Sequence, residues 1–383
     1  MLTFLIGLAL AGDCSLRDGA YLLTVEPGDG VQTLFGHTAL LVYDEQQAGY
    51  SPVYDWGRFD YEPFPSLAWA VLTMTKEYYL ASKTVDEMVA RYDREGRGVV
   101  AQRLDLSAEE ADVLSKAVAE DLNGGGQFLY NWYEPNCTTM VRDHIDGAVG
   151  GDLRAQLQDP GASPAGEVLR HAGPHLPLWL GLQWGSGRVA RAPVSRFDAT
   201  FLPEQLHDEL AGASRGGRPL VEDTCTLGAV PYPGVPNVGP SRVGWLGLVG
   251  LLWALLLAGS RRVGAAAAGA GAVGTGLVLG AWGSAALLVG SLGTFAPFWG
   301  HHNLFLASPL HLLLLVAGGW HLRRPEATGP MGMVAVCIAS GLLGLGWSAL
   351  GAFADGNLGL ALATLLPLSG LAWAVSPRPE PGS

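Results

Sequence analysis

Two residues a hundred positions apart, Cys137 and His37, have the surroundings that thiol chemistry needs. Cys137 follows Pro135 and Asn136, which end one segment, and it precedes apolar residues with helical spacing. The sequence therefore predicts a thiol at a helix N-terminus, where the helix dipole and the unpaired amides of the first turn stabilise a thiolate. The imidazole of His37, in the run FGHTA at 35–39, can take the thiol proton.

A third polar group is needed to hold the other nitrogen of the imidazole and fix its tautomer. Asp55 is the candidate, because it lies on the predicted strand that follows the His37 strand, and an antiparallel hairpin brings such positions side by side. Alternatives stay open at this point. A strand-end Asp can be a turn residue, and the pair can be a small buried Cys and a hydrogen-bonded strand His.

A small sheet and several helices would position these residues. Alternating apolar residues indicate strands, whereas helical periodicity and a capping box at 107–110 indicate helices. The predicted strands lie at 21–25, 37–43, 53–56 and 99–106, and the predicted helices lie at 64–79, at 107–122 and after Cys137. This pattern predicts an α+β domain in which the nucleophile lies on a helix that faces the sheet carrying the base.

Composition separates this domain from the C-terminal part of the chain. The chain is 49% hydrophobic and only 15% charged, and beyond residue 243 charges nearly vanish for long stretches. The net charge of −12 excludes nucleic acid as an expected partner, because phosphate contacts need clustered Lys and Arg. Five apolar segments have about the length that crosses a bilayer. They lie at 243–260, 264–292, 304–320, 331–350 and 358–375.

Arginines follow the first, third and fifth of these segments, and the other two connections have no Lys or Arg, so the arginine-bearing ends are predicted to face the cytoplasm. Residues before 243 then lie outside the cytoplasmic membrane. The predicted organisation is a signal-like segment at 1–11, an extracytoplasmic cysteine-enzyme-like domain at 12–215, a Pro/Gly-rich linker at 216–242, a five-helix transmembrane bundle at 243–375 and a cytoplasmic tail at 376–383.

The first eleven residues form a short apolar run that ends in ALA, as at a signal-peptidase site. A basic region is missing from its start, so an uncleaved anchor and a misassigned start are the alternatives to a cleaved signal. Export to an oxidising compartment would let Cys14 pair with Cys225, since both flank the globular part and neither has catalytic surroundings. Cys337 lies in an apolar segment and is expected to be a small buried residue.

Three runs together resemble one family of bacterial proteins. They are FGHTAL at 35–40, YDWGRFD at 54–60 and YNWYEPNCTTMVRD at 130–143. They are similar to the N-terminal periplasmic domain of the Lnb family of lipoprotein N-acyltransferases, and the likeness extends over about residues 20–375. The resemblance implies an α+β permuted papain-like (NlpC-type) domain followed by an all-α transmembrane helix bundle, in a multi-pass protein of the bacterial inner membrane with the catalytic domain on the periplasmic side.

The resemblance also implies an activity. A phospholipid would donate an acyl chain to Cys137 as a thioester, and the α-amino group of a lipoprotein diacylglyceryl-cysteine would accept it, with His37 and Asp55 assisting. No metal or other cofactor is expected. Two other functions stay open: a membrane-tethered cysteine hydrolase acting on peptidoglycan peptides or lipid esters, and a non-catalytic assembly factor. The residues expected to contact substrate are Tyr54, Trp56, Asn136, Thr138, His301, His302 and Asn303.

Overall fold

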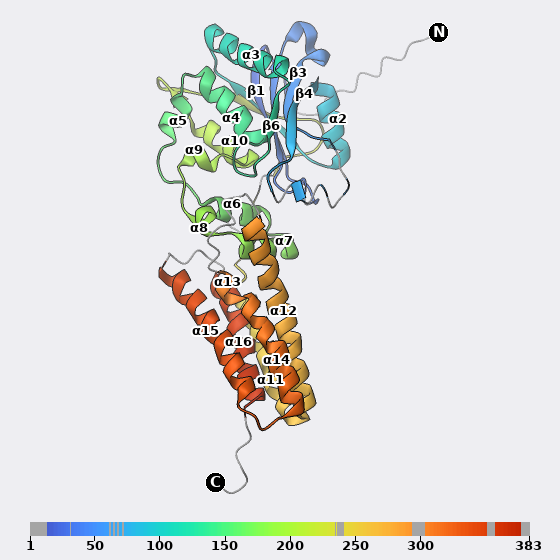
Figure 1. The fold of residues 1–383 in the computed structure, drawn as a ribbon. Helices are drawn as coiled ribbons and strands as arrows, with labels where there is room; N and C mark the ends of the chain where they lie inside the picture. The colour runs from blue at the N-terminus through green and yellow to red at the C-terminus, as the bar shows by residue number, and fades with distance from the viewer. Residues whose placement is uncertain are drawn as a thin grey trace, which may run out of the picture. The chain divides into compact units, whose positions relative to one another are not determined.

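The computed structural model describes residues 14–30, 32–60, 63, 66, 69–70, 73–233, 235, 241–292, 303–350 and 357–376. The chain divides into two compact units (Figure 1). One unit, Met1–Ala172 with Pro193–Asn237, contains a β-sheet and is called the sheet unit below. The other, Gly173–Ala192 with Val238–Ser383, is helical in its described part and is called the helical unit.

The sheet unit is built on a seven-stranded sheet with the order β6-β4-β3-β2-β1-β5-β9, in which every neighbouring pair is antiparallel. The strands are β1 (Gly19–Val25), β2 (His37–Tyr43), β3 (Pro52–Arg58), β4 (Glu77–Thr84), β5 (Val99–Leu104), β6 (Gln127–Leu129) and β9 (Val221–Leu227), and a separate ribbon pairs β7 (Ser214–Arg215) with β8 (Arg218–Pro219). The predicted strands at 21–25, 37–43, 53–56 and 99–106 are confirmed as β1, β2, β3 and β5.

Helices cover both faces of this sheet. Successive residues along a strand point to opposite faces, and each face contributes apolar side chains to its own core. On β1, for example, Leu22 lies in one core while its neighbours Tyr21 and Leu23 lie in the other. Helices α3, α4 and α10 contribute to the first core and α2 to the second. The helices of the unit are η1 (Glu45–Tyr50), α2 (Val85–Glu95), α3 (Ala108–Asn123), α4 (Cys137–Ala148), α5 (Asp152–Gln156), α6 (Pro164–His171), α9 (Arg196–Ala199) and α10 (Pro203–Gly212).

Two sequence predictions about this unit are corrected. The helix predicted at 64–79 is wrong at its end, because residues from Glu77 onward form β4, which pairs with both β3 and β6. Most of 61–72 lies outside the described residues. Part of the segment predicted as a linker, 216–242, instead forms β8 and β9, and β9 is the edge strand next to β5. Pairing with other strands determines the secondary structure of both segments, and this pairing cannot be recognised from the local sequence.

The helical unit contains four helical segments that are long and apolar enough to cross a membrane. They are Val243–Val263, Ala265–Ser291, Asn303–Arg323 and Gly329–Gly346, and a shorter apolar helix covers Leu358–Ala374. That the chain crosses the membrane five times thus stays a prediction. The helices of the unit are α7 (Leu176–Gly185), α8 (Arg188–Arg191), α11 (Val243–Val263), α12 (Ala265–Leu292), α13 (Asn303–Leu306), η3 (Pro309–Leu312), α14 (Leu313–Arg323), α15 (Gly329–Leu350) and α16 (Asn357–Ala374).

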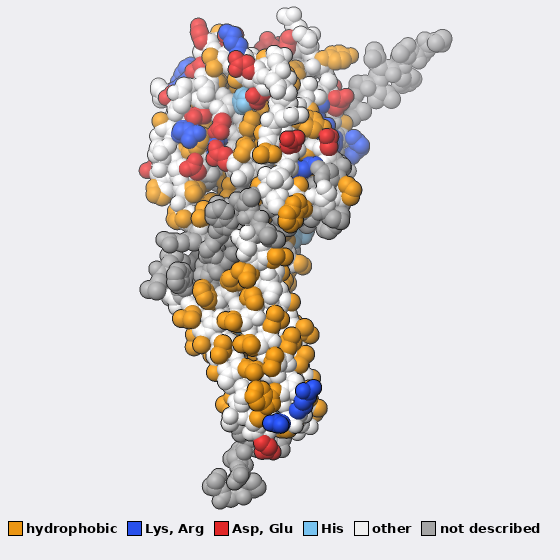
Figure 2. Space-filling view, in the orientation of Figure 1, with side chains coloured by type: hydrophobic (Ala, Val, Ile, Leu, Met, Phe, Trp, Pro, Cys, Tyr) orange, Lys and Arg blue, Asp and Glu red, His pale blue; other side chains and the backbone are white. Residues whose placement is uncertain are grey.

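The visible surface of the helix bundle is mainly apolar, and its charged side chains gather at one end, whereas the sheet unit has both signs of charge spread over its surface (Figure 2). Exposed leucines such as Leu256 and Leu343 lie along the bundle. Arg261 and Arg262 end α11, and Arg323 ends α14. An apolar surface with arginines at the helix ends is the distribution expected of helices surrounded by lipid.

Candidate active site

Cys137 is the first residue of α4, which confirms the prediction that its thiol lies at a helix N-terminus. The preceding Asn136 caps the helix: its side-chain oxygen accepts hydrogen bonds from the amides of Thr138 and Thr139 at 2.9 and 3.0 Å. The Asn136 side-chain amide donates in turn to the carbonyls of Trp132 and Phe201 at 3.0 and 3.1 Å. This double attachment fixes the position at which the helix begins, and with it the position of the thiol.

His37 comes from the opposite side of the site, at the start of β2. The preceding Gly36 has a φ of +77°, and a Cβ there would lie 2.6 Å from the Val25 carbonyl, so only glycine suits this entry into the strand. The hydroxyls of Thr38 and Thr138, the residues that directly follow His37 and Cys137, lie 3.0 Å apart. Since α4 packs against β2 and β3, the two residues that are a hundred positions apart meet in space.

Asp55 on β3 holds the imidazole. Its Oδ1 lies 2.7 Å from His37 Nε2 and also accepts the amide of Gly57 at 2.9 Å. Gly57 lies where the β3–β4 register shifts, and a Cβ there would come within 2.5 Å of His37 Cε1. The missing side chain therefore makes room for the ring. Because Nε2 is engaged by Asp55, Nδ1 is the nitrogen left to face the thiol.

Two cations surround the other oxygen of Asp55. Lys83 Nζ on β4 lies 2.7 Å from Oδ2, and Arg58 Nε lies 4.0 Å from it. Burial would raise the pKa of Asp55, but attraction and hydrogen bonding to His37 and Lys83 lower that pKa well below its usual range. Asp55, only 3% exposed, is thus kept as a carboxylate. Lys83 was missed at the sequence level because β4 was partly assigned to a helix.

The electrostatics of the pair favour a thiolate beside an imidazolium. Burial opposes charge on both groups, but attraction to His37 and hydrogen bonds from His37, the Thr38 amide and Thr138 outweigh it and lower the pKa of Cys137. For His37, burial alone would lower the pKa, and attraction to Asp55 and Cys137 raises it well above its usual value. Both shifts favour a state of the pair in which the proton resides on His37.

The amides of the first turn, which were expected to be unpaired, are not all available to stabilise negative charge. Those of Thr138 and Thr139 donate to the Asn136 cap, which leaves the amide of Cys137 itself among the first three. The Thr138 hydroxyl lies 3.0 Å from that of Thr38 and 3.9 Å from the thiol sulfur. Burial and the charge of Cys137 also raise the pKa of Tyr130, so that its phenol stays protonated. Neither Thr38 nor Tyr130 was predicted from the sequence to contribute to the site.

Several residues expected to contact substrate have buried side chains with protein partners instead. Trp56 is fully buried and donates to Asp121 at 2.8 Å, Asn136 is the helix cap, and Thr138 is fully buried against Thr38. Asn303 belongs to the helical unit, where its buried amide donates to the carbonyls of Gln183 and Trp184. The polar groups of these four residues are thus engaged within the protein, and their contact with substrate stays a prediction.

The remaining expected residues have other placements. Tyr54 is half-buried at the margin of the core on β3, and its substrate contact stays a prediction. His301 and His302 lie outside the described residues. Cys14 and Cys225 are joined by a disulfide bond that ties the start of the described chain to β9, 211 residues later. Cys337 is buried in α15.

A nucleophile at a helix N-terminus, an imidazole beside it and a buried carboxylate behind the imidazole form the arrangement of enzymes that work through an acyl-thiol intermediate. Residues 15–170 match the family model described as the Lnb N-terminal periplasmic domain, so this part of the chain is similar to that domain. No curated protein and no solved structure matches the chain. The chain thus joins a part similar to a periplasmic domain to four helical segments that are long and apolar enough to cross a membrane.

Proposed function

We propose that the protein is an acyltransferase that moves an acyl chain from a phospholipid, through a thioester on Cys137, to the α-amino group of a lipoprotein diacylglyceryl-cysteine. The packing of the Cys137 helix against the His37 strand, with His37 held by Asp55, carries the proposal, because it brings a nucleophile and a proton carrier to one place. The histidine strand precedes the cysteine helix in sequence, which also supports the permuted papain-like, NlpC-type fold as part of the proposal. Both substrates are lipids, and membrane-capable helices in the same chain suit them.

The first half-reaction forms the thioester. The Cys137 thiolate attacks the ester carbonyl of the donor, and the negative charge that develops on the carbonyl oxygen is stabilised by the Cys137 amide and the Tyr130 hydroxyl. As the tetrahedral species collapses, the ester C–O bond breaks and the His37 imidazolium gives its proton to the leaving oxygen. The products are a thioester on Cys137 and a lysophospholipid.

The second half-reaction returns the site to its starting state. Neutral His37 takes a proton from the attacking amino group, the new C–N bond forms and the C–S bond breaks. The acyl chain leaves as an amide on the lipoprotein, and the thiolate and the imidazolium are restored. Asp55 keeps the imidazole oriented in both steps and stays ionised because Lys83 and His37 stabilise its charge.

Intact-mass analysis of the purified protein tests the proposal. After incubation with a defined phospholipid in micelles, we expect a mass increase of one acyl chain, which hydroxylamine removes because it cleaves thioesters. The Cys137→Ala variant should show no adduct, and Cys337→Ala, which alters the buried cysteine of α15, should acylate like the wild type. An adduct that persists in Cys137→Ala, or none in the wild type, would exclude this mechanism. Release of free fatty acid in the presence of a lipopeptide acceptor would favour the hydrolase instead.

A further inference from the structure

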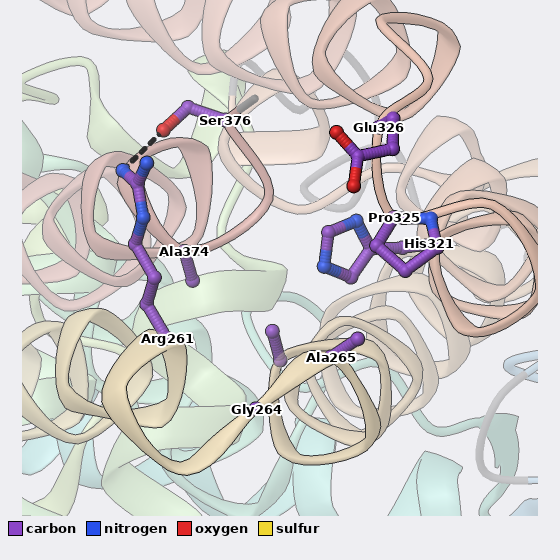
Figure 3. Close-up of a pocket in the computed structure, with 9 residues that line it drawn as sticks. Arg261, Gly264, Ala265, His321, Pro325, Glu326, Ala374 and Ser376 are labelled. Atoms are coloured by element: carbon purple, nitrogen blue, oxygen red, sulfur yellow. Dashed lines mark hydrogen bonds between the residues drawn. The ribbon is translucent and has the colours of Figure 1, made fainter. Parts of the chain in front are cut away.

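The arginine-bearing end of the helical unit contains a cavity of about 330 Å³ (Figure 3). Residues near the end of α11, the start of α12, and the ends of α14 and α16 line it. Its polar lining consists of a guanidinium, an imidazole, a carboxylate and a hydroxyl, from Arg261, His321, Glu326 and Ser376. No step of the proposed acyl transfer uses these residues.

The N-terminus of α12 opens into this cavity. Gly264 and Ala265 line it, and the carbonyl of Gly264 accepts the amides of Ala267 and Ala268, both at 3.1 Å. The first two amides of the helix, those of Ala265 and Ala266, precede this bonding pattern and point out of the helix start. Because α12 is 28 residues long, its dipole is fully developed and favours a negative charge at this end.

A buried imidazole supplies a second, independent indication of a ligand. His321 is only 5% exposed, and among the described residues its Nδ1 has no hydrogen-bond partner. Its ring faces the cavity in Figure 3. A buried nitrogen without a partner costs free energy, which a hydrogen bond to a bound group would recover.

Arg261 is already positioned at the cavity. Its guanidinium donates to the Trp373 carbonyl and to Ser376 Oγ at 3.0 and 2.6 Å, and it lies 4.6 Å from the centre of the Trp373 ring. A side chain fixed in this way loses little conformational entropy when it meets an anion. Positive charge, helix amides and an imidazole therefore converge on one space, and a phosphate group suits all three.

Glu326 makes a purely anionic ligand less suitable. Its carboxylate lies across the cavity from Arg261 (Figure 3), and its side chain is exposed at the rim. A ligand with a phosphate at the helix start and an ammonium near Glu326 would match both charges. Apolar side chains around this end, Val263, Leu322 and Trp373, are 80, 47 and 62% exposed, which suits neighbouring acyl chains.

We propose that this cavity binds a phosphodiester that carries an ammonium group, as in the ethanolamine head group of a phospholipid. The phosphate would lie between the start of α12, Arg261 and His321, and the ammonium would lie beside Glu326. By the distribution of arginines, this lipid belongs to the cytoplasmic leaflet, where basic pockets between helices bind head groups. The site is separate from the thiol chemistry and would act whether or not Cys137 is acylated.

The Ala265→Glu variant tests the site without removing any contact. A carboxylate at the first position of α12 stabilises the helix, so the variant should fold, and it would occupy the place of the phosphate. We expect the full-length protein in detergent to bind dihexanoyl-phosphatidylethanolamine by native mass spectrometry, with affinity at least about tenfold weaker in Ala265→Glu, the effect of one charge-assisted contact. The control is Ala265→Gln, whose side chain has the size of the glutamate in Ala265→Glu but no charge, and it should bind the lipid like the wild type. Equal binding in all three proteins, or none in the wild type, would overturn the proposal.

Two further comparisons decide the ligand. Glycerophosphoethanolamine has the same head group without acyl chains, and it should bind more weakly than the lipid; equal affinity would overturn a lipid source and indicate a soluble phosphate compound. Glu326→Gln should lose preference for phosphatidylethanolamine over phosphatidylglycerol, since it lacks the charge that the ammonium would meet. An unchanged preference would overturn the assigned place of the ammonium.

Discussion

Replacing Asp55 with Asn should separate the electrostatic role of this carboxylate from its role as a hydrogen-bond partner. Asn is nearly isosteric and can still accept a hydrogen bond from His37 Nε2, which lies 2.7 Å from Oδ1. What the variant loses is the negative charge that raises the pKa of His37 and thereby supports the thiolate. It also leaves Lys83, whose side chain is 10% exposed, without its ionic partner and close to the imidazole.

The size of the effect of Asp55→Asn can be estimated from the distance between the charges of Asp55 and His37. Two unit charges about 4 Å apart attract by roughly 4 kcal/mol at an effective dielectric constant of 20. The His37 side chain is 15% exposed and the Asp55 side chain 4%, so partial hydration reduces this only in part. A net loss of about 2–4 kcal/mol in the stability of the imidazolium corresponds to a 30- to 1000-fold slower acylation of Cys137.

The pH dependence of the reaction should change in a defined direction in Asp55→Asn. In the wild type, reactive thiolate forms as pH rises through the lowered pKa of Cys137, and the proton needed by the leaving group is lost as pH rises through the raised pKa of His37. In Asp55→Asn the pKa of Cys137 should rise and that of His37 should fall, because the pair loses its supporting charge. The active pH interval should narrow from both sides.

Alkylation of the thiol by iodoacetamide, followed across pH by intact mass, measures this interval. We expect the low-pH limb to move to higher pH in Asp55→Asn. Lys83→Met is the control: it removes a cation that opposes imidazolium formation while leaving Asp55 beside His37, so its low-pH limb should stay or move to lower pH. If Asp55→Asn alkylates with the wild-type profile and acylates within a fewfold of the wild-type rate, the electrostatic reasoning is wrong.

Two other predictions concern the scaffold of the site. Gly57→Ala would place a methyl group 2.5 Å from His37 Cε1, so the ring must move away from its partners; we expect loss of acyl adduct with little change in thermal unfolding, and an adduct at wild-type rate would refute the steric role of Gly57. Replacing Cys14 and Cys225 by Ser removes a link that spans 211 residues, and the unfolding free energy of the sheet unit should fall by about 2–4 kcal/mol. Denaturant titration measures the change, and an unchanged midpoint would show that the link contributes nothing.

The thiol position was predictable from sequence because a helix start is encoded locally. Pro135 and Asn136 signal the end of one segment and a cap for the next, and the structure begins α4 one residue later. The closeness of Asp55 to His37 was also accessible, since adjacent antiparallel strands β2 and β3 follow one another in the chain. Signals that act over a few residues, or between consecutive strands, were sufficient for these three side chains.

The position of Lys83 at the site and the edge strand β9 could not be predicted from such local signals. Residues 64–79 have apolar side chains at helical spacing, but the end of that segment pairs with β3 and with β6, about fifty residues later, and this pairing turns it into a strand. The stretch near Val221 is followed by prolines and glycines and resembles a tether, yet β5 and the link to Cys14 hold it in the sheet. Contacts of high sequence separation, which carry no local pattern, decide both places.

Lys83 influences which groups of the site can exchange a proton. In the proposed mechanism, four groups alternate in charge: the Cys137 thiolate, the His37 imidazolium, the Asp55 carboxylate and the Lys83 ammonium. When the proton returns from His37 to a substrate, the outer pair of Asp55 and Lys83 stays neutral as a unit. Because Lys83 stabilises the carboxylate, Asp55 does not compete with the imidazole for the proton. Proton transfer is thus confined to the thiol, the imidazole and the substrate, which is what alternating acid and base steps by one histidine require.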